Sequence, residues 1–231
     1  MTPEPGLISY TRKHRSIIAA GIALAFLAQI VLILGIRYLP IDLYDKLFYS
    51  RFIFWGVVAL LFFYANKIEK QPLLLWEKGS SDVGFFIIAV FVLYLISVAC
   101  GILSALPRLF GMHENDKVIK MVQKVLTGHD ALIFFMSLTA GVTEEVIFRG
   151  YILTRLTKLL KGKYLPVIIS AVLFSALHYG YNSLQELIFA FLIGVAFGTF
   201  YQKYRNIKIL IVVHFLIDMI SLELATHLLK K

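Results

Sequence analysis

Six ionisable side chains lie in three stretches of the sequence that are otherwise apolar. They are Glu144, Glu145, Arg149, His178, His214 and Asp218. Carboxylates and imidazoles are the side chains that most often exchange protons with a reacting group, and both also bind metal ions. These residue types therefore indicate either a hydrolytic site, in which a carboxylate activates water, or a chain of groups that relays protons.

The spacing within the stretches favours one proton acceptor in particular. Glu145 and Arg149 are four residues apart, so on a helix they face the same way and can form an ion pair, which could be purely structural. His214 and Asp218 have the same spacing. Glu144 points about 100° away from Glu145 around the helix and is left unpaired. Two adjacent carboxylates and one arginine leave an unbalanced negative charge in an apolar setting, which favours Glu144 as the proton acceptor.

The composition excludes a water-soluble enzyme. The 231 residues are 59% hydrophobic and 16% charged, against roughly 45–50% and about 25% in ordinary soluble domains. The mean hydropathy is +0.81. The net charge of +9 comes from short basic clusters between apolar runs, and no basic face is long enough to follow a phosphate backbone, which argues against nucleic acid as a partner.

The apolar runs predict a polytopic, all-α membrane helix bundle with about seven transmembrane helices (six to eight). A spanning helix needs about 20 mostly apolar residues. The candidates are residues 17–36, 47–65, 83–106, a run that starts near 131 and passes through the first motif, 165–181, 184–201 and 207–229. Residues 1–129 are predicted to hold three helices and a linker, and residues 130–231 a four-helix catalytic core.

Two features between and within the runs have simple interpretations. The polar stretch 108–130 repeats Val118, Met121, Val122 and Val125 at helical spacing, so it is predicted to lie on the membrane interface or to cap the bundle. Arg51 lies inside the second run, and we expect its long side chain to extend toward the membrane surface.

The basic residues predict the orientation of the chain. The N-terminal segment and the second, fourth and sixth loops hold 13 Lys and Arg residues, against 8 on the other side. Because cytoplasmic loops carry the excess of positive charge, the N-terminus is predicted to be cytoplasmic.

A count of residues predicts that two of the motifs face each other. Glu144 lies 17 residues before Lys161 and His178 lies 17 residues after it. In an antiparallel helical hairpin, both side chains then stand about 25 Å from the turn. His214 lies only 9 residues past Arg205, so the last helix has to tilt or begin at a higher level to bring it to the same site.

These motifs resemble those of the CAAX prenyl protease and bacteriocin-processing (Abi, CPBP) family of glutamic intramembrane endopeptidases. The family pattern is Glu-Glu-x-x-x-Arg, then Phe-x-x-x-His, then His-x-x-x-Asn or Asp, together with an aromatic residue followed by spaced glycines. It is met here, over about residues 130–220, by Glu144, Glu145, Arg149, Phe174, His178, His214, Asp218, Phe191, Gly194 and Gly198. The glycine pair is also the spacing that lets two helices pack closely.

The resemblance implies an endopeptidase that cleaves a membrane-associated or lipidated protein, or the precursor of a secreted peptide, in the plasma membrane of a bacterium or archaeon. It implies that Glu144 and His178 hold and deprotonate the attacking water. His214 and Asp218 would bind the oxyanion or position the water, while Glu145 and Arg149 orient these groups.

Asp218 departs from the prenyl protease branch, which has Asn at this position. An ionised Asp repels an oxyanion, so either Asp218 is protonated or its role differs. A carboxylate at this position also makes a Zn²⁺ site an alternative to metal-free water activation. Its ligands would be Glu144, His178, His214 and Asp218. Because the chain has no His-Glu-x-x-His zinc helix, we favour water activation without a metal or other cofactor.

Two other classes of protein place such residues within membrane spans. A proton-coupled transporter uses intramembrane carboxylates and histidines as a relay, but it more often has inverted repeats and broken helices, which the sequence does not show. A non-catalytic membrane scaffold or immunity protein could keep the fold after losing activity. The complete set of polar residues favours the protease.

Overall fold

The computed structural model describes residues 12–76, 82–112, 115 and 117–229, and over this range it is helical without strands. Of the basic residues counted above, Lys78, Lys230 and Lys231 lie outside the described residues. The helices are α1 (Arg12–Arg37), α2 (Leu43–Phe63), the π-helix η1 (Tyr64–Glu69), α3 (Val83–Ser104), α4 (Leu106–Leu109), α5 (Lys117–Leu126), α6 (Asp130–Glu145), the π-helix η2 (Val146–Leu153), α7 (Thr154–Leu159), α8 (Tyr164–Leu177), the 3₁₀-helix η3 (His178–Tyr181), α9 (Leu184–Tyr204) and α10 (Ile207–Leu229).

Seven helical units within this range are long and apolar enough to cross a membrane, which confirms the predicted multi-pass bundle. Large apolar side chains point outward along their length, among them Val31 (64% exposed) on α1 and Ile88 (63% exposed) on α3. An apolar exterior on this scale is stable in lipid and not in water. The chain is therefore an integral membrane protein.

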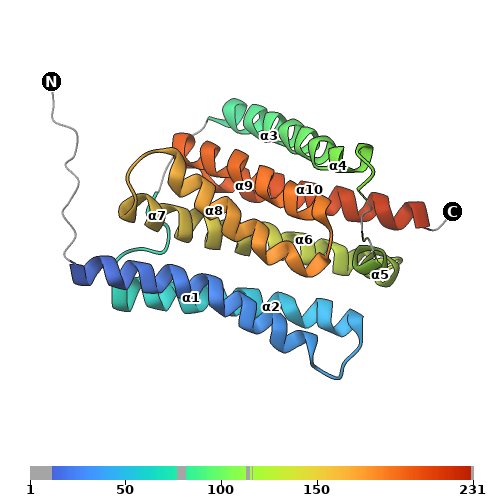
Figure 1. Ribbon diagram of the computed structural model, residues 1–231, viewed down its shortest axis with the longest axis horizontal. Coiled ribbons are helices and arrows are strands. Elements are labelled where there is room, and N and C mark those ends of the chain that lie inside the picture. The colour runs from blue at the N-terminus through green and yellow to red at the C-terminus, as the bar shows by residue number, and fades with distance from the viewer. Residues whose placement is uncertain (1–11, 77–81, 113–114, 116, 230–231) are drawn as a thin grey trace.

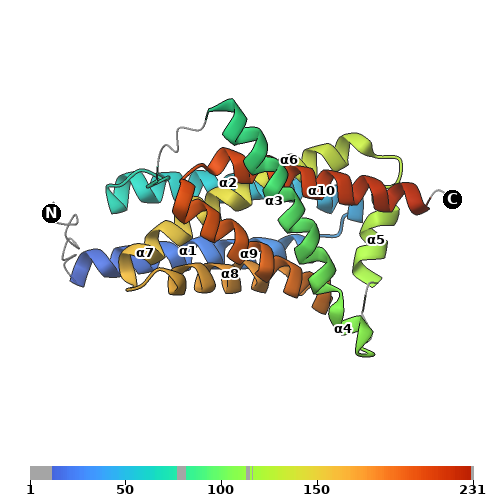
Figure 2. The ribbon, with the colours of Figure 1, turned by 90° about the horizontal axis from the view of Figure 1, so that it is seen from above.

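The long helices form three groups that lie side by side (Figure 1). α1 and α2 pair along one side, α3 covers the opposite side, and α6, α8, α9 and α10 lie between them. Figure 2 shows that α3 crosses α9 and α10 obliquely. The core follows this arrangement, because one buried apolar cluster joins α1 and α2 to η2, and another joins α3 to α9 and α10.

The short helix α5 lies across one end of the bundle (Figure 2). It contacts α2, α6 and α10. Its last residue, Leu126, is buried against Ile133, and Val122 packs on the same cluster. The sequence predicted that this segment either lies on the membrane interface or caps the bundle, and in the structure it caps the bundle.

Small residues let α8 and α9 approach closely, as the glycine spacing predicts. A Cβ added to Gly194 would lie 2.8 Å from Cβ of Ala171 and 2.9 Å from its Cα, and one added to Gly198 would lie 3.0 Å from Cγ1 of Val167. Contacts below 3.0 Å do not occur between real side chains, so at Gly194 the helix backbones would have to separate.

We expect Gly194→Ala to destabilise the protein by about 1–3 kcal/mol, because the added methyl group overpacks the α8–α9 contact. Gly56→Ala is the matched control in α2, where an added Cβ meets nothing within 4 Å. There the better helix propensity of alanine should raise stability by up to about 1 kcal/mol. Thermal unfolding in detergent measures both, and a Gly194→Ala protein as stable as the Gly56→Ala protein would contradict the close packing.

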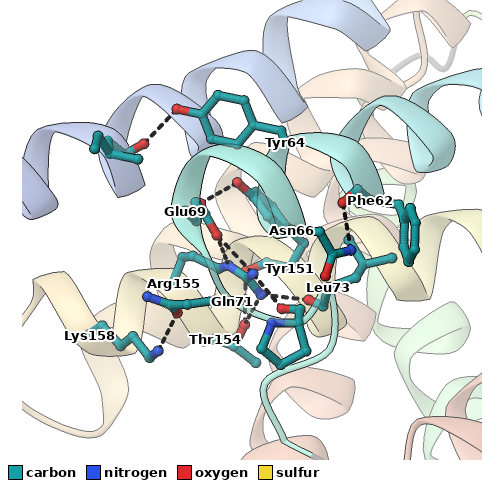
Figure 3. A network of polar contacts seen from close by, with 12 residues as sticks. Phe62, Tyr64, Asn66, Glu69, Gln71, Leu73, Tyr151, Thr154, Arg155 and Lys158 are labelled. Atoms are coloured by element: carbon teal, nitrogen blue, oxygen red, sulfur yellow. Dashed lines mark hydrogen bonds and ion pairs between the residues drawn. The ribbon is translucent and has the colours of Figure 1, made fainter.

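A buried ion pair joins η1, which follows α2, to α7 (Figure 3). Glu69 and Arg155 are both buried, and Nη2 of Arg155 donates to Oε2 of Glu69 at 2.9 Å. The same guanidinium donates to the carbonyls of Pro72 and Leu73 at 2.8 and 2.6 Å. The Tyr151 hydroxyl donates to the other Glu69 oxygen at 2.6 Å. Every charge in this network therefore has partners, which is the condition for burying it.

Candidate active site

A cavity of about 480 Å³ lies inside the bundle, lined by all the long helices and by α5. Four of the six predicted site residues line it: Glu144, His178, His214 and Asp218. The other two, Glu145 and Arg149, are buried and are not part of the lining. The structure thus divides the predicted site into side chains that a substrate can reach and side chains that support them.

Glu145 is the centre of the supporting layer. Its Oε1 accepts from Nη1 of Arg149 at 2.9 Å and lies 2.8 Å from Nδ1 of His214. Glu145 is the ion-pair partner of Arg149, and a carboxylate oxygen accepts, so in this contact Nδ1 of His214 is the donor. The other ring nitrogen, Nε2, lies 3.7 Å from Oδ2 of Asp218 and 3.9 Å from Oε2 of Glu144. A buried carboxylate that orients an imidazole in this way is the arrangement that acid–base catalysis needs.

Two aromatic rings hold Arg149 in place. Its Cζ lies 4.4 Å from the ring centroid of Phe174 and 5.4 Å from that of Phe197. Arg149 also belongs to the π-helix η2, which begins directly after Glu145. π-Helical segments inside α-helices are rare and occur frequently at functional sites. The sequence motif predicted the ion pair but not this change of helix type.

His178 has a defined hydrogen-bonding state as well. Its Nδ1 lies 3.0 Å from the carbonyl oxygen of Phe174, and a carbonyl only accepts, so Nδ1 carries the hydrogen. In the neutral ring, Nε2 then presents a lone pair as an acceptor. The ring packs against Phe174 at a centroid distance of 4.8 Å, so the phenylalanine of the Phe-x-x-x-His motif contacts both His178 and Arg149.

The turn after His178 fixes where its helix ends. Asn182 has a φ of 55°, in the left-handed region that asparagine tolerates better than most residues. The Ser183 side chain then accepts from the backbone N–H of Glu186 at 3.1 Å and caps α9. These two residues separate η3 from α9 and keep His178 at the cavity.

A close contact between α6 and α10 brings His214 to the level of Glu145. A Cβ on Gly141 would lie 3.0 Å from the carbonyl oxygen of Ile211 and 3.0 Å from the backbone nitrogen of Phe215. Residue counting from the turn placed His214 lower in the bundle, since it assumed equal turns and parallel axes. The packing of the glycine face of α6 on α10 decides the register instead.

Several cavity residues were not predicted from the sequence. Arg51 lines the cavity, so the expectation that it extends to the membrane surface is wrong. Gln29, Ser137 and Tyr181 line it as well. The signal available in the sequence was a charge inside an apolar span, which by itself is a reason to suspect function. The position of Arg51 in the cavity follows from the packing of α2 beside α6, which the sequence does not show.

The donor set does not form a metal centre as it stands. Over the described part of the chain, no three His, Cys, Asp or Glu side chains group closely enough to hold a metal ion. A zinc ion needs its ligand atoms about 2.0–2.2 Å away. Nδ1 of His214 bonds to Glu145, which leaves Nε2, 3.7 Å from Asp218 and 3.9 Å from Glu144, as the ring nitrogen that a metal could use. Zinc therefore stays an alternative, which the chelation experiment below tests.

Comparisons with known proteins agree with the motifs. Residues 130–220 match the family model of the type II CAAX prenyl endopeptidases, described as Rce1-like, which confirms the predicted resemblance over that range. The chain is also 27% identical over 173 residues to the UPF0177 protein YvdC of Lactococcus lactis subsp. lactis (strain IL1403). That match covers 75% of this chain and 64% of the relative. No solved structure matches the chain.

Proposed function

We propose that this chain is an intramembrane endopeptidase, in which Glu144 and His178 activate water to hydrolyse a peptide bond of a membrane-associated substrate. The observation that carries the proposal is the layered site. Glu144, His178, His214 and Asp218 line one cavity within the spans, and the buried Glu145 orients His214 from behind. The match to the Rce1-like family supports the reaction class.

The proposed reaction uses two proton transfers. A water in the cavity donates one hydrogen bond to the Glu144 carboxylate and one to Nε2 of His178, which directs an oxygen lone pair at the scissile carbonyl. As the oxygen attacks the carbonyl carbon, Glu144 takes a proton. When the C–N bond breaks, Glu144 gives this proton to the leaving amine. The products are a carboxylic acid and an amine, and the enzyme returns to its starting state.

The oxyanion that forms during the attack needs a hydrogen-bond donor, and we assign this role to Nε2 of His214. Nδ1 is held by Glu145, so the ring cannot turn away. Nε2 lies between Asp218 and Glu144, and a ring protonated on both nitrogens offers its second hydrogen there. Asp218 lies on the same side of the ring as Nε2. A protonated Asp218 can donate a hydrogen bond to the oxyanion, whereas an ionised Asp218 can only accept from Nε2 before the substrate binds.

Protein termini in the native host test the proposed function. Cells that produce wild-type protein are compared with cells that produce the Glu144→Ala protein at a matched level, and peptide termini are quantified by mass spectrometry. We expect specific new termini with the wild type that disappear in the variant. If the termini are the same, and Glu144→Ala still rescues the phenotype of a null strain, the protein is not a protease.

Chelation tests the metal-free part of the proposal. We expect purified enzyme treated with EDTA or 1,10-phenanthroline to keep its activity to within about twofold, because Glu144 and His178 activate the water without a Lewis acid. The control is to add Zn²⁺ back to the treated enzyme. Loss of activity that Zn²⁺ restores would instead support the zinc alternative.

The cavity lies toward the end of the bundle opposite to the basic N-terminal end, since Gln29 and Arg51, near the α1–α2 turn, line it. With a cytoplasmic N-terminus, we expect this end to face outward. In a Cys100→Ala background, Tyr38→Cys, at an 81% exposed position in that turn, should react with an impermeant maleimide in intact cells. Lys161→Cys, at the opposite end, should react only after permeabilisation. The reverse pattern would invert the orientation.

A further inference from the structure

The wall of the cavity formed by α1 and α2 carries polar groups that the proposed reaction does not use. Gln29 on α1 and Arg51 on α2 both line the cavity. Both lie outside residues 130–220, the part that matches the Rce1-like family. The side chains of the proposed reaction come from α6, η3 and α10 and line the same cavity.

Arg51 forms no ion pair within the part of the chain that the structure describes. Its Nε and Nη2 donate to the Ser50 hydroxyl at 3.1 and 2.8 Å, and its Cζ lies 5.0 Å from the ring centroid of Phe54. Among the described residues, no carboxylate lies within 4.0 Å of the guanidinium. A guanidinium has five N–H donors, so a bound ligand can still receive hydrogen bonds from it.

Two buried side chains of the cavity lining also have hydrogen-bonding capacity to spare. Gln29 and Ser137 are each 1% exposed, and over the described part of the chain neither Oε1 of Gln29 nor Oγ of Ser137 has a partner. Nε2 of Gln29 donates to the carbonyl of Ala25 at 2.9 Å, which leaves Oε1 as the atom that accepts. A buried polar atom without a partner is costly, and an amide N–H supplies what Gln29 lacks.

We propose that Arg51 binds a carboxylate of the substrate, while Gln29 accepts a hydrogen bond from the adjacent peptide N–H. This assignment rests on the proposed function, and it makes Arg51 a specificity-determining residue of that site. A neutral group would leave the guanidinium beside the Phe54 ring with no carboxylate within 4.0 Å among the described residues, whereas a carboxylate matches the guanidinium fork. Arg51 is close enough to Glu144 and Asp218 to interact with them electrostatically, so the bound carboxylate lies near the scissile bond.

The test separates binding from cleavage. The Glu144→Gln protein, which should bind peptide without cleaving it, is titrated in detergent with dansyl-labelled pentapeptides of Ala, Leu, Ile, Val and Phe residues. Each peptide is made as a free C-terminal acid, as a C-terminal amide, and as an amide with one internal Glu. Fluorescence anisotropy gives the Kd for each. The same titrations are repeated with Arg51→Gln, Arg51→Lys and, as a matched loss of one positive charge outside the cavity lining, Arg37→Gln.

We expect the carboxylate-bearing peptides to bind about 10- to 100-fold more tightly than the plain amide, the value of a charge-assisted contact. Preference for the acid or for the internal Glu tells whether the carboxylate is the chain terminus or a side chain. Arg51→Gln should remove the preference and leave the amide's Kd within about twofold, Arg51→Lys should keep part of it, and Arg37→Gln should keep it all.

Two results would overturn the assignment. One is equal binding of acid, internal-Glu and amide peptides by the protein that retains Arg51, a comparison that does not depend on whether any Arg51 variant folds. The other is an equal loss for all peptides in Arg51→Gln. A third outcome separates the two proposals. If carboxylate binding depends on Arg51, but wild-type protein cleaves none of the bound peptides and produces no new peptide termini in cells, the protease function is rejected and the carboxylate-binding site is retained.

Discussion

Replacing Glu144 by Gln is expected to slow peptide cleavage by about 10³-fold or more, with the fold unchanged. Glutamine keeps the shape of the side chain and its hydrogen-bonding capacity, but it cannot accept and return a proton at neutral pH. Stability should hold because Glu144 lines the cavity and its nearest charged partner, Nε2 of His214, is 3.9 Å away. The measurement is the single-turnover rate on a cleaved peptide, together with thermal unfolding in detergent.

Glu223→Gln is the matched control for this variant. Glu223 lies on the same helix as His214 and Asp218, pairs with His227 at 3.7 Å, and is not part of the cavity lining. The single-turnover cleavage rate of the Glu223→Gln protein should equal that of the wild type. A Glu144→Gln protein that keeps full activity would exclude Glu144 as the base and would direct attention to Nε2 of His178.

Arg155→Met is expected to have the largest effect on stability, a loss of about 3–5 kcal/mol. Removing one partner of a buried ion pair leaves the other charge without compensation. Here Glu69, which is 2% exposed, would keep, among the described residues, only the Tyr151 hydroxyl as a side-chain donor. For a chain of this size, the loss corresponds to a fall in Tm of about 6–20 °C. η1, which follows α2, would also lose its ion pair to α7, the helix that carries Arg155.

Two further variants make this prediction specific. Lys161→Met removes a positive charge from an exposed turn at the same end of the bundle, and its Tm should stay near that of the wild type. The double variant Glu69→Gln/Arg155→Met removes both charges and should regain part of the stability. A single Arg155→Met variant that unfolds within about 2 °C of the wild type would show that the pair contributes little.

The membrane fold could be predicted from the sequence because the bilayer allows few alternatives. Every backbone polar group within lipid must bond inside its own segment, so an apolar run of about 20 residues is a helix. All seven predicted spans are confirmed. The second differs most, since it begins at Leu43 and continues to Glu69. The added C-terminal part contains the polar residues Asn66 and Lys67 and ends at Glu69, which pairs with the buried Arg155.

The residue pairs within one helix could also be predicted from the sequence, because residues four apart lie on the same face of a helix regardless of the tertiary structure. Glu145 and Arg149 form the predicted pair at 2.9 Å. Their spacing left open whether the pair was purely structural. The structure adds His214, 69 residues away, as a second partner of Glu145. The pair therefore supports a cavity side chain as well as the fold.

By itself, then, the sequence determined that the chain crosses the membrane about seven times and which polar residues lie within the spans. Only the tertiary structure decided what each charge does. Two arginines show the difference, since Arg51 lines the cavity and Arg155 pairs with Glu69, 86 residues away. Local sequence cannot distinguish these outcomes, because the neighbours of a charge are set by which helices pack together. In this chain the small residues at Gly141 and Gly194 set that packing.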